Sequence, residues 1–360
     1  MEFRNPPWHY QQVFSTLAEY DELTWGQKLV DLPEAWTKSR GAGVKIAVLD
    51  TGCQLDHPDL KDQILGAKDF SGSAYGPEDQ QGHGTHCAGI IAAANDDHGS
   101  IGVAPDLAKS VTENKNDYTI KTTHVSGGGL YIAKVLGDNG FGSHQKIADG
   151  INWSVEKKVD IISMSLGSRD TSPPLFEAIN NAIDAGVFVI CAAGNDGKAR
   201  LLPSFPANMG TTIAVGAVGK DSIVADYSSR GAAVDIAAPG SDIMSTFTGS
   251  GYAVLSGTSM ATPFVAGVAA LIISKHKRLG GKSPVESQEH LREHMNRYAI
   301  DLGETGEDDN YGSGLINPVG MLRKETRPSD TIDVDQLKKL LTRALNIVDP
   351  VEVEPDDSKD

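Results

Sequence analysis

Short apolar runs alternate with longer amphipathic stretches along the chain from residue 44 onward. The apolar runs are rich in Val and Ile, and several are apolar almost throughout, which is typical of strands buried on both faces of a parallel sheet. The amphipathic stretches have the length and period of helices. Strands are predicted at residues 44–49, 131–136, 161–166, 187–192, 212–218 and 234–237, and helices at 83–94, 143–157, 174–185 and 258–276. This order predicts an α/β fold whose mainly parallel, twisted β-sheet has helices on both faces.

Two segments depart from the alternating pattern. Residues 106–129 are polar and end in three glycines, so they are predicted to form a surface insertion. Residues 319–360 contain one amphipathic helix and then an acidic tail, which we expect to be disordered. The helix is predicted from an apolar stripe of Val334, Leu337, Leu341, Leu345 and Val348.

The composition is that of a globular protein with one large domain. A chain of 360 residues can bury a single α/β core, which we assign to residues 21–318. The formal net charge of −16 gives a field that repels nucleic acid and anionic membranes, so neither is expected as a partner. The same charge favours cations as ligands, although an acidic surface that only aids solubility explains it equally well.

Targeting signals and cysteines bear on the cellular compartment. Residues 1–20 lack the apolar stretch of about 7–15 residues that marks a secretory signal. The longest later apolar runs, 187–193 and 264–273, are shorter than the roughly 20 residues that cross a membrane. The three cysteines are an odd number, which fits reduced thiols better than a disulfide framework: Cys53, Cys87 and Cys191. We therefore expect a cytoplasmic protein.

Reactive side chains stand among small residues in three segments. In the first, an apolar run ends in Asp50, and the carboxyl ends of parallel strands are where open α/β sheets place their sites. A capping or turn residue would give the same pattern. In the second, His83 lies between two glycines that leave its imidazole approachable, and in the third, Ser259 opens a predicted long helix.

The histidine and serine segments each have an alternative interpretation. Serine is favoured as an N-cap at a helix start. Here, however, Gly257 and Ala261 clear space around Ser259, and the free N–H groups of the helix start could stabilise an oxyanion. The alternative for the histidine segment is metal binding, with ligands drawn from Asp50, His57, His83, His86 and His98.

Together the three segments supply a carboxylate, a base and a nucleophile in the order Asp50, His83, Ser259. These segments resemble the subtilisin family closely, and the resemblance runs from about residue 25 to residue 318, interrupted by the insertion. It implies a subtilisin-like fold, serine endopeptidase activity and a catalytic triad of these three residues. In the mechanism that it implies, the serine attacks the scissile carbonyl, the histidine carries the proton to the leaving amine, and an acyl-enzyme forms.

The resemblance extends to residues that would bind the substrate. Asn195 resembles the family's oxyanion-hole amide, and it would act beside the Ser259 N–H. Two edge segments would pair with an extended peptide, and a third segment would line a roomy, uncharged pocket for the residue before the cut. These are Gly140, Phe141 and Gly142; Ser165, Leu166 and Gly167; and Ala192, Ala193 and Gly194. We therefore expect broad specificity with a preference for apolar or aromatic residues at that pocket.

A structural calcium ion (Ca2+) is also implied by the resemblance. Residues 94–100 match the family's calcium-binding loop in length and position, although His98 and Ser100 stand where relatives are apolar. Side chains and carbonyl groups would supply the oxygen ligands that calcium prefers. The expected ligands are Asp59, Ala94, Asp96, His98, Ser100 and, as a further candidate, Asp21. A polar turn that binds no metal is the alternative.

Within the family, residues 50–53, 159–167 and 189–195 look most like the intracellular bacterial subtilisins. That branch carries a short inhibitory N-terminal extension and commonly forms dimers, so the resemblance implies a propeptide in residues 1–20 and a homodimer. The branch's usual Leu-Ile-Pro-Tyr motif is absent, and a disordered tail is the alternative. Phe205-Pro206 lies where the family has a cis peptide bond.

Three functions remain open from the sequence. They are an active peptidase that acts on proteins or peptides, a catalytically silent peptide-binding relative, and a metallohydrolase that uses the His and Asp cluster. The peptidase is favoured because the three triad residues and Asn195 are all present.

Overall fold

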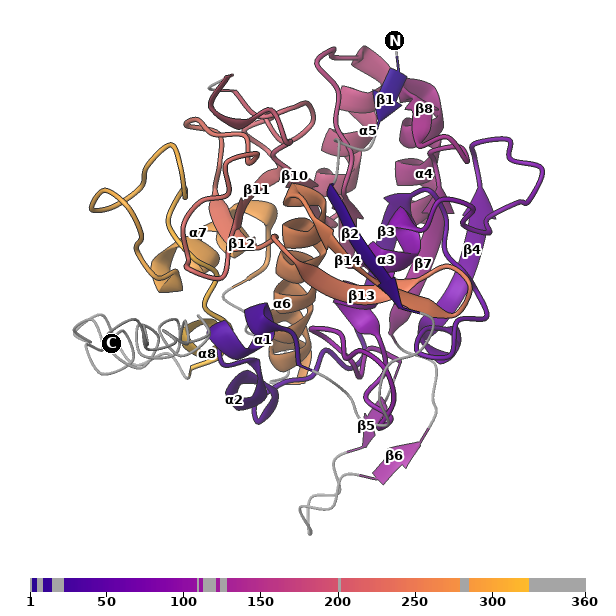
Figure 1. Ribbon diagram of the computed structural model, residues 1–360, viewed down its shortest axis with the longest axis horizontal. Helices are drawn as coiled ribbons and strands as arrows, with labels where there is room; N and C mark the ends of the chain where they lie inside the picture. Colours follow the sequence, from indigo (N-terminus) through magenta and orange to yellow (C-terminus); the bar gives the residue numbers. More distant parts are fainter. Residues whose placement is uncertain are drawn as a thin grey trace, which may run out of the picture.

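The computed structural model describes residues 2–4, 9–14, 23–108, 110–112, 121–123, 128–199, 202–278 and 285–323. Its centre is a seven-stranded sheet in the order β12-β11-β10-β9-β3-β7-β4, with every neighbouring pair parallel (Figure 1). The strands are β3 (Lys45–Asp50), β4 (Ile64–Asp69), β7 (Gly129–Lys134), β9 (Ile161–Met164), β10 (Phe188–Ala192), β11 (Ile213–Val218) and β12 (Ile236–Pro239). The predicted parallel α/β sheet is confirmed, and every strand except β4 lies at a predicted apolar run.

β4 departs from the apolar pattern because its residues are half-buried or exposed. None of its six residues is buried, and Gly66 and Lys68 interrupt its apolar character. β12 lies at the other edge of the sheet but is buried at all four positions and does follow the apolar pattern, so the burial of the two faces decides the sequence and not the edge position.

Helices cover both faces of the sheet, as predicted. On one face lie α3 (His83–Ala92) and α6 (Thr258–Arg278), and on the other lie α4 (His144–Glu156) and α5 (Pro173–Asp184). Each pair buries its own apolar core against the sheet. α5 ends where predicted, since Gly186 follows its last turn with a φ of +83°.

The central strands contribute side chains to both cores. In β3, Ile46 and Val48 belong to the core on the α3 and α6 side, whereas Ala47 and Leu49 belong to the core on the α4 and α5 side. Successive side chains of a strand point to opposite faces, so a strand covered on both sides is apolar at every position. This is the physical reason that these strands could be predicted from apolar runs.

α6 is the one described helix that is long and apolar enough to cross a membrane. It extends the apolar run 264–273 at both ends, and 94% of the window that meets this criterion is buried inside the protein. Such burial is expected of the core helix of a globular protein.

Shorter elements surround the sheet and were not predicted, because they are brief or polar. Burial of apolar side chains continues past residue 318, to Met321 and Leu322. The other elements are α1 (Trp25–Leu29), α2 (Leu32–Trp36), η1 (Lys61–Gln63), η2 (Gly197–Ala199), β13 (Ile243–Phe247), β14 (Gly251–Ser256), α7 (Gln288–Tyr298) and α8 (Pro318–Met321).

The insertion and the N-terminal segment add short strands. In the insertion, β5 (Ser110–Thr112) pairs antiparallel with β6 (Lys121–Thr123), and the pair projects from the body in Figure 1. Near the N-terminus, β1 (Glu2–Arg4) pairs with β8 (Phe141–Ser143), and β2 (His9–Phe14) pairs with β14. The predicted helix around Leu341 and the acidic tail lie outside the described residues.

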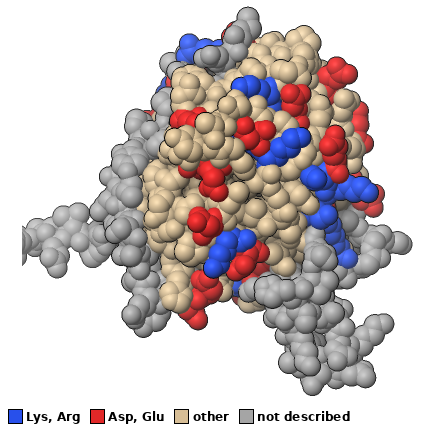
Figure 2. All heavy atoms as spheres, turned by 90° about the vertical axis from the view of Figure 1, so that its right-hand side faces the viewer, with Lys and Arg blue, Asp and Glu red and all other residues tan. Residues whose placement is uncertain are grey.

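Charge is mixed on the face seen in Figure 2. There, acidic and basic side chains are interspersed, although the formal net charge of the chain is −16. A mixed surface of this kind suits solubility better than recognition of a charged polymer.

The strand order of the sheet reverses at β3, which ends at Asp50. β3 lies between β7 and β9, and the chain leaves β3 at Asp50. In open α/β sheets, ligands bind outside the carboxyl ends of the strands at such a point.

Candidate active site

Asp50 and His83 form a buried pair. Asp50 is the last residue of β3, and His83 is the first residue of α3. The Nδ1 of His83 lies 2.8 Å from Asp50 Oδ1, and the two side chains are 0% and 1% exposed. With Nδ1 donating to the carboxylate, Nε2 of the neutral ring becomes the proton acceptor.

The charge of Asp50 governs the protonation of the ring. Burial by itself would lower the pKa of His83, but the neighbouring Asp50 carboxylate, assisted by Cys87, raises this pKa well above its ordinary value of 6.5. A buried imidazolium is therefore stabilised, which is what a base that accepts a proton during a reaction requires.

Glycines allow β3 to meet α3 at close range. A Cβ at Gly84 would lie 2.1 Å from the carbonyl oxygen of Gly52 and 3.2 Å from the Cβ of Asp50. Gly82 has a φ of +97°, and a Cβ there would lie 2.3 Å from the ring of Phe247. The glycines beside His83 were expected to open the imidazole to substrate, but in the structure they permit close packing around it.

Asp79 anchors the start of α3 and was missed by the sequence reasoning. Its buried carboxylate accepts hydrogen bonds from the N–H groups of Gln81, Gly82 and Thr85 and from the hydroxyls of Thr51 and Thr85. An anion at a helix N-terminus is stabilised by the free N–H groups there. The only signal in the sequence is a carboxylate four positions before His83.

Ser259 lies at the second position of α6, next to Ser165 and Cys87. Its hydroxyl lies 3.4 Å from the Ser165 carbonyl oxygen, while its own carbonyl accepts from Ser165 Oγ at 2.8 Å and from Cys87 Sγ at 3.4 Å. The sulfur of Cys87 in turn lies 3.8 Å from His83 Nδ1. Ser259 and His83 thus contact the same cysteine, and the structure brings all three predicted triad residues into one buried neighbourhood.

The expected metal set is not assembled. Among the described residues, the group of side chains close enough to share a metal is Asp50, His83 and Cys87, which excludes His57, His86 and His98. His86 Nε2 instead contacts the carbonyls of Ile243 and Ala253 at 3.1 and 3.0 Å, and burial lowers its pKa to about 3. Of the histidines in this alternative set, His57 and His98 also contact backbone carbonyls, and His83 pairs with Asp50.

Asn195 is held beside the serine by Thr258. The amide oxygen of Asn195 accepts from the Thr258 N–H at 3.0 Å and from the Thr258 hydroxyl at 2.9 Å. This directs its NH₂ group toward Gly257, where a Cβ would lie 3.1 Å from the nitrogen. Gly257 therefore leaves room next to a fixed donor, as an oxyanion hole requires.

The structure gives the surroundings of the expected substrate-binding segments. Gly142 and Phe141 lie in β8, which pairs antiparallel with β1 of the N-terminal extension. Gly167 and Gly194 both lie against Ser204, since a Cβ on either would come within 2.8 Å of its side chain. The edge segment 165–167 and the segment predicted to line the pocket, 192–194, therefore share one neighbour.

A charged pair joins the residues that follow these two segments. Arg169 Nη2 lies 3.2 Å from Asp196 Oδ1, with the side chains 69% and 23% exposed. The sequence reasoning expected an uncharged pocket and did not single out this pair. The peptide bond between Phe205 and Pro206, which follows Ser204, is cis as expected.

The loop expected to bind calcium lies against Asp59. The Ala94 N–H donates to the Asp59 carbonyl at 2.9 Å, and the Ser100 N–H donates to its buried carboxylate at 3.2 Å. The Tyr252 hydroxyl also donates to this carboxylate. A buried carboxylate beside a loop rich in oxygen atoms fits a hard cation.

The remaining expected ligands are placed less directly. His98 Nδ1 contacts the carbonyl of Asp96 at 3.0 Å, on the exposed side of the loop. Asp21 lies outside the described residues.

The three cysteines form no disulfide bond, as expected. They are Cys53, Cys87 and Cys191, and all three are buried.

Comparison with known proteins places this site in a family. Residues 41–314 match the model of the subtilase family, peptidase S8. The chain is 42% identical over 268 residues to the intracellular serine protease of Paenibacillus polymyxa, covering 72% of this chain and 76% of the relative. It is 41% identical over 298 residues to the major intracellular serine protease of Bacillus subtilis (80% and 87% covered) and 40% identical over 296 residues to subtilisin Savinase of Lederbergia lenta (82% and 97% covered). The chain therefore belongs to the subtilase family of serine endopeptidases.

Proposed function

We propose that this endopeptidase works through an acyl-enzyme, with Ser259 as the nucleophile, His83 as the general base and Asp50 as the carboxylate that orients the base. The observation that carries the proposal is the 2.8 Å contact between His83 Nδ1 and Asp50 Oδ1 in a fully buried pair. This contact holds the imidazole in the tautomer whose Nε2 accepts the serine proton.

The steps follow from these positions. Ser259 Oγ attacks the scissile carbonyl carbon while its proton passes to His83 Nε2, and the carbonyl oxygen becomes an oxyanion. The Asn195 NH₂ group and the Ser259 N–H stabilise that oxyanion. The C–N bond then breaks, and the leaving amine takes the proton from His83. Water, activated by the same histidine, finally hydrolyses the ester and frees Ser259.

Substrates are proteins or peptides, bound in an extended conformation. Gly140, Phe141 and Gly142 on one side, and Ser165, Leu166 and Gly167 on the other, would form main-chain hydrogen bonds with the peptide. Support comes from β1, a segment of this chain that already pairs with β8 in the manner of an added strand. Backbone pairing tolerates many sequences, so we propose broad specificity.

The pocket for the residue before the cut is lined by Ala192, Ala193 and Gly194. All three are buried and uncharged, which supports a preference for apolar or aromatic side chains. The pair of Arg169 and Asp196 lies at the end of these walls and satisfies its own charges. A panel of tetrapeptide substrates tests the preference, and a strict requirement for Lys or Arg would contradict it.

A fluorophosphonate probe tests the proposal as a whole, because it labels only an activated serine. We expect covalent labelling of the full chain, with the modification located on Ser259 by peptide mass spectrometry, and no labelling of Ser259→Ala. Chelator-sensitive hydrolysis without labelling would instead favour a metallohydrolase. Peptide binding without labelling or hydrolysis would favour a silent relative.

We further propose that residues 1–20 act as an inhibitory propeptide. β1 occupies the edge of β8, with Phe3 opposite Gly142, and β2 pairs with β14 so that His9 lies opposite Ser256, three residues before the nucleophile. A strand on this edge competes with the substrate strand for the same backbone groups. Cleavage near residue 20 in the wild-type chain, absent in Ser259→Ala, is the expected sign of self-processing.

Calcium and compartment complete the proposal. We propose a structural calcium ion held by Asp59 with Ala94, Asp96, His98 and Ser100, and by Asp21 as a further ligand. The ion would stabilise the loop and take no part in the chemistry. We also propose a cytoplasmic location, since relatives in Paenibacillus and Bacillus are named intracellular proteases and all three cysteines here are free.

A further inference from the structure

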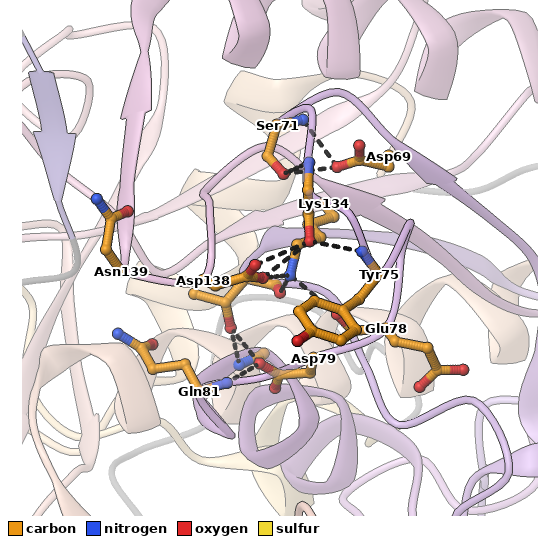
Figure 3. A network of polar contacts seen from close by, with 12 residues as sticks. Asp69, Ser71, Tyr75, Glu78, Asp79, Gln81, Lys134, Asp138 and Asn139 are labelled. Atoms are coloured by element: carbon orange, nitrogen blue, oxygen red, sulfur yellow. Dashed lines mark hydrogen bonds and ion pairs between the residues drawn. The ribbon is translucent and has the colours of Figure 1, made fainter.

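Lys134 carries a fully buried ammonium group beside the proposed catalytic pair. It is the last residue of β7 and lies opposite Asp50 in the register of β3 and β7. Its side chain is 0% exposed, which is rare for lysine unless its charge is matched by partners. Figure 3 shows the ammonium at the centre of a network of polar side chains and backbone groups.

Three oxygen atoms accept hydrogen bonds from the ammonium group. Its Nζ lies 2.7 Å from the Thr51 carbonyl oxygen, 2.9 Å from the Glu78 carbonyl oxygen and 2.8 Å from Asp138 Oδ1. An ammonium has three N–H donors, so all of its hydrogen-bonding capacity is used. Because a buried charge is costly without partners, these three oxygens are held firmly around the nitrogen.

Two of these acceptors flank the proposed catalytic pair. Thr51 directly follows Asp50, and its hydroxyl both donates to Asp79 at 3.0 Å and accepts from the Gly84 N–H at 2.9 Å. Glu78 directly precedes Asp79, whose carboxylate accepts hydrogen bonds from the Gly82 and Thr85 N–H groups at the start of the helix that begins at His83. Lys134 therefore holds the strand that carries the carboxylate and the loop that leads to the base.

The third acceptor lies in the turn that leads into the substrate-binding edge, residues 140–142. Asp138 lies in the turn between β7 and β8, and its carboxylate also accepts a hydrogen bond from the Ser73 hydroxyl. Asp138 is 36% exposed, and the Lys134 ammonium holds the pKa of its carboxyl below the ordinary range. One nitrogen thus connects this edge with both segments of the catalytic pair.

We propose that Lys134 is a positioning residue that couples the substrate-binding edge to the Asp50–His83 pair, with Asp138 as the connecting arm. When a peptide pairs along β8, the turn that contains Asp138 becomes less mobile. Because Asp138 holds the Lys134 ammonium, the carbonyl groups of Thr51 and Glu78 that bind the ammonium are then held in place as well. Binding far from the scissile bond then improves the alignment of the base, which raises kcat as well as lowering KM. This inference rests on the proposed function, because it needs a base whose alignment limits turnover.

Substrate length tests the coupling in the full chain. In the wild type, lengthening a peptide substrate along β8 is expected to raise kcat. In Asp138→Asn, the longer peptide still has the lower KM, but the gain in kcat falls by about tenfold, the scale of one charge-assisted hydrogen bond. The melting temperature of this variant is expected to fall, because the fully buried Lys134 ammonium loses the negative charge of Asp138, so kcat and KM are compared at a temperature at which both enzymes are folded.

Ser73→Ala is the matched control, since it removes the other partner of the same carboxylate and keeps the ion pair. It is expected to retain the full gain in kcat with peptide length. Lys134→Met is expected to lose the gain together with much of kcat, and the Asp138 variant keeps the test sharp if Lys134→Met does not fold.

Two results would overturn the coupling: an unchanged gain in Asp138→Asn, or an equal loss in Ser73→Ala. Neither result affects fluorophosphonate labelling of Ser259. Absence of that labelling in the wild type would instead reject the proposed function itself.

Discussion

Thr258 fixes the orientation of Asn195 through two hydrogen bonds to a single oxygen atom. A donor held in this way needs little rearrangement when an oxyanion forms, which is why such groups contribute strongly to catalysis. Thr258 also accepts a hydrogen bond from the Gly194 N–H, so the residue before the proposed nucleophile organises the whole oxyanion side of the site.

Replacing the amide tests this role. Asn195→Ala is expected to lower kcat by about 100- to 1000-fold with little change in KM, the range found when this donor is removed from a subtilisin. Thr258→Val keeps the amide but removes one of the two hydrogen bonds that hold it. Its kcat should lie between those of Asn195→Ala and the wild type. Steady-state kinetics on one peptide substrate measure both, and a normal kcat in Asn195→Ala would show that the oxyanion is stabilised by other groups.

The raised pKa of His83 predicts the pH profile. Catalysis needs the neutral base, so kcat/KM should rise with pH through a pKa above 6.5. Asp50→Asn removes the anion that raises this pKa, so the acid limb should move to lower pH while the plateau falls by about 10⁴-fold. An acid limb at the same pH in both enzymes would mean that another group controls the profile.

The same shift has the opposite effect on stability. Because folding raises the pKa of His83, the imidazolium–carboxylate pair contributes stability in full below the unfolded pKa of about 6.5. This contribution is lost as the pH rises through the folded value. The enzyme therefore becomes active over the pH range in which this pair contributes least to stability.

At the scale of elements, the site depends on how closely β3 meets α3. Gly84→Ala would place a Cβ 2.1 Å from the backbone oxygen of Gly52, so one of the two segments would have to shift. We expect a loss of about 1–3 kcal/mol of stability from overpacking, together with lost activity. Gly210→Ala, at a position with no atom within 4 Å, is the control and should unfold like the wild type in denaturant titrations.

The N-terminal strands make a separate prediction. Deleting residues 1–8 removes β1 but leaves β2 in its sheet, and it should raise kcat/KM by roughly tenfold or more, because a tethered segment competes at a high effective concentration. The measurement is peptide hydrolysis by the two purified chains before any self-cleavage. Equal activity would remove the inhibitory role.

Element prediction succeeded where burial is simple. β9, β10 and β11 lie inside the sheet and are buried at every position, so their sequences are apolar apart from Ser163. β13 and β14 contain serine and threonine and form a small antiparallel sheet beside α3, so their pattern did not separate them from loops. α7 was missed because its sequence is largely polar, although its Gln288 side chain bonds the backbone of Val189 in β10.

For the whole molecule, calcium should act as a stabilising ligand. A ligand present at about 100 times its Kd adds roughly 2.7 kcal/mol to the stability of a folded protein, which is readily seen as a higher melting temperature. We expect the melting temperature to fall when calcium is replaced by a chelator, and this difference to vanish in Asp59→Asn. Asp62→Asn, which changes an exposed carboxylate nearby, should keep the difference in melting temperature between calcium and chelator. Equal melting temperatures of the wild type with calcium and with chelator would reject the site.

The candidate site was predicted in part, and the limit has a physical cause. Asp50, His83 and Ser259 stand in segments with small residues, and Asn195 was expected from the resemblance to the subtilisin family. The structure places His83 beside Asp50 at the end of β3, and Asn195 beside Thr258, which precedes Ser259. Lys134 and Asp79 were missed because their importance comes from partners that are distant in the chain. A single lysine inside an otherwise apolar predicted strand was the available signal, since a charge there must be paired.

The central claim is that Ser259, His83 and Asn195 act on one tetrahedral carbon. The most direct measurement is a crystal structure of the full chain with a peptide boronate, which forms a tetrahedral adduct with an activated serine. The account predicts a covalent bond to Ser259 Oγ, His83 Nε2 within hydrogen-bonding distance of the adduct, and one boronate oxygen about 2.7–3.1 Å from the Asn195 nitrogen. An adduct on another residue, or a boronate oxygen that points away from Asn195, would contradict it.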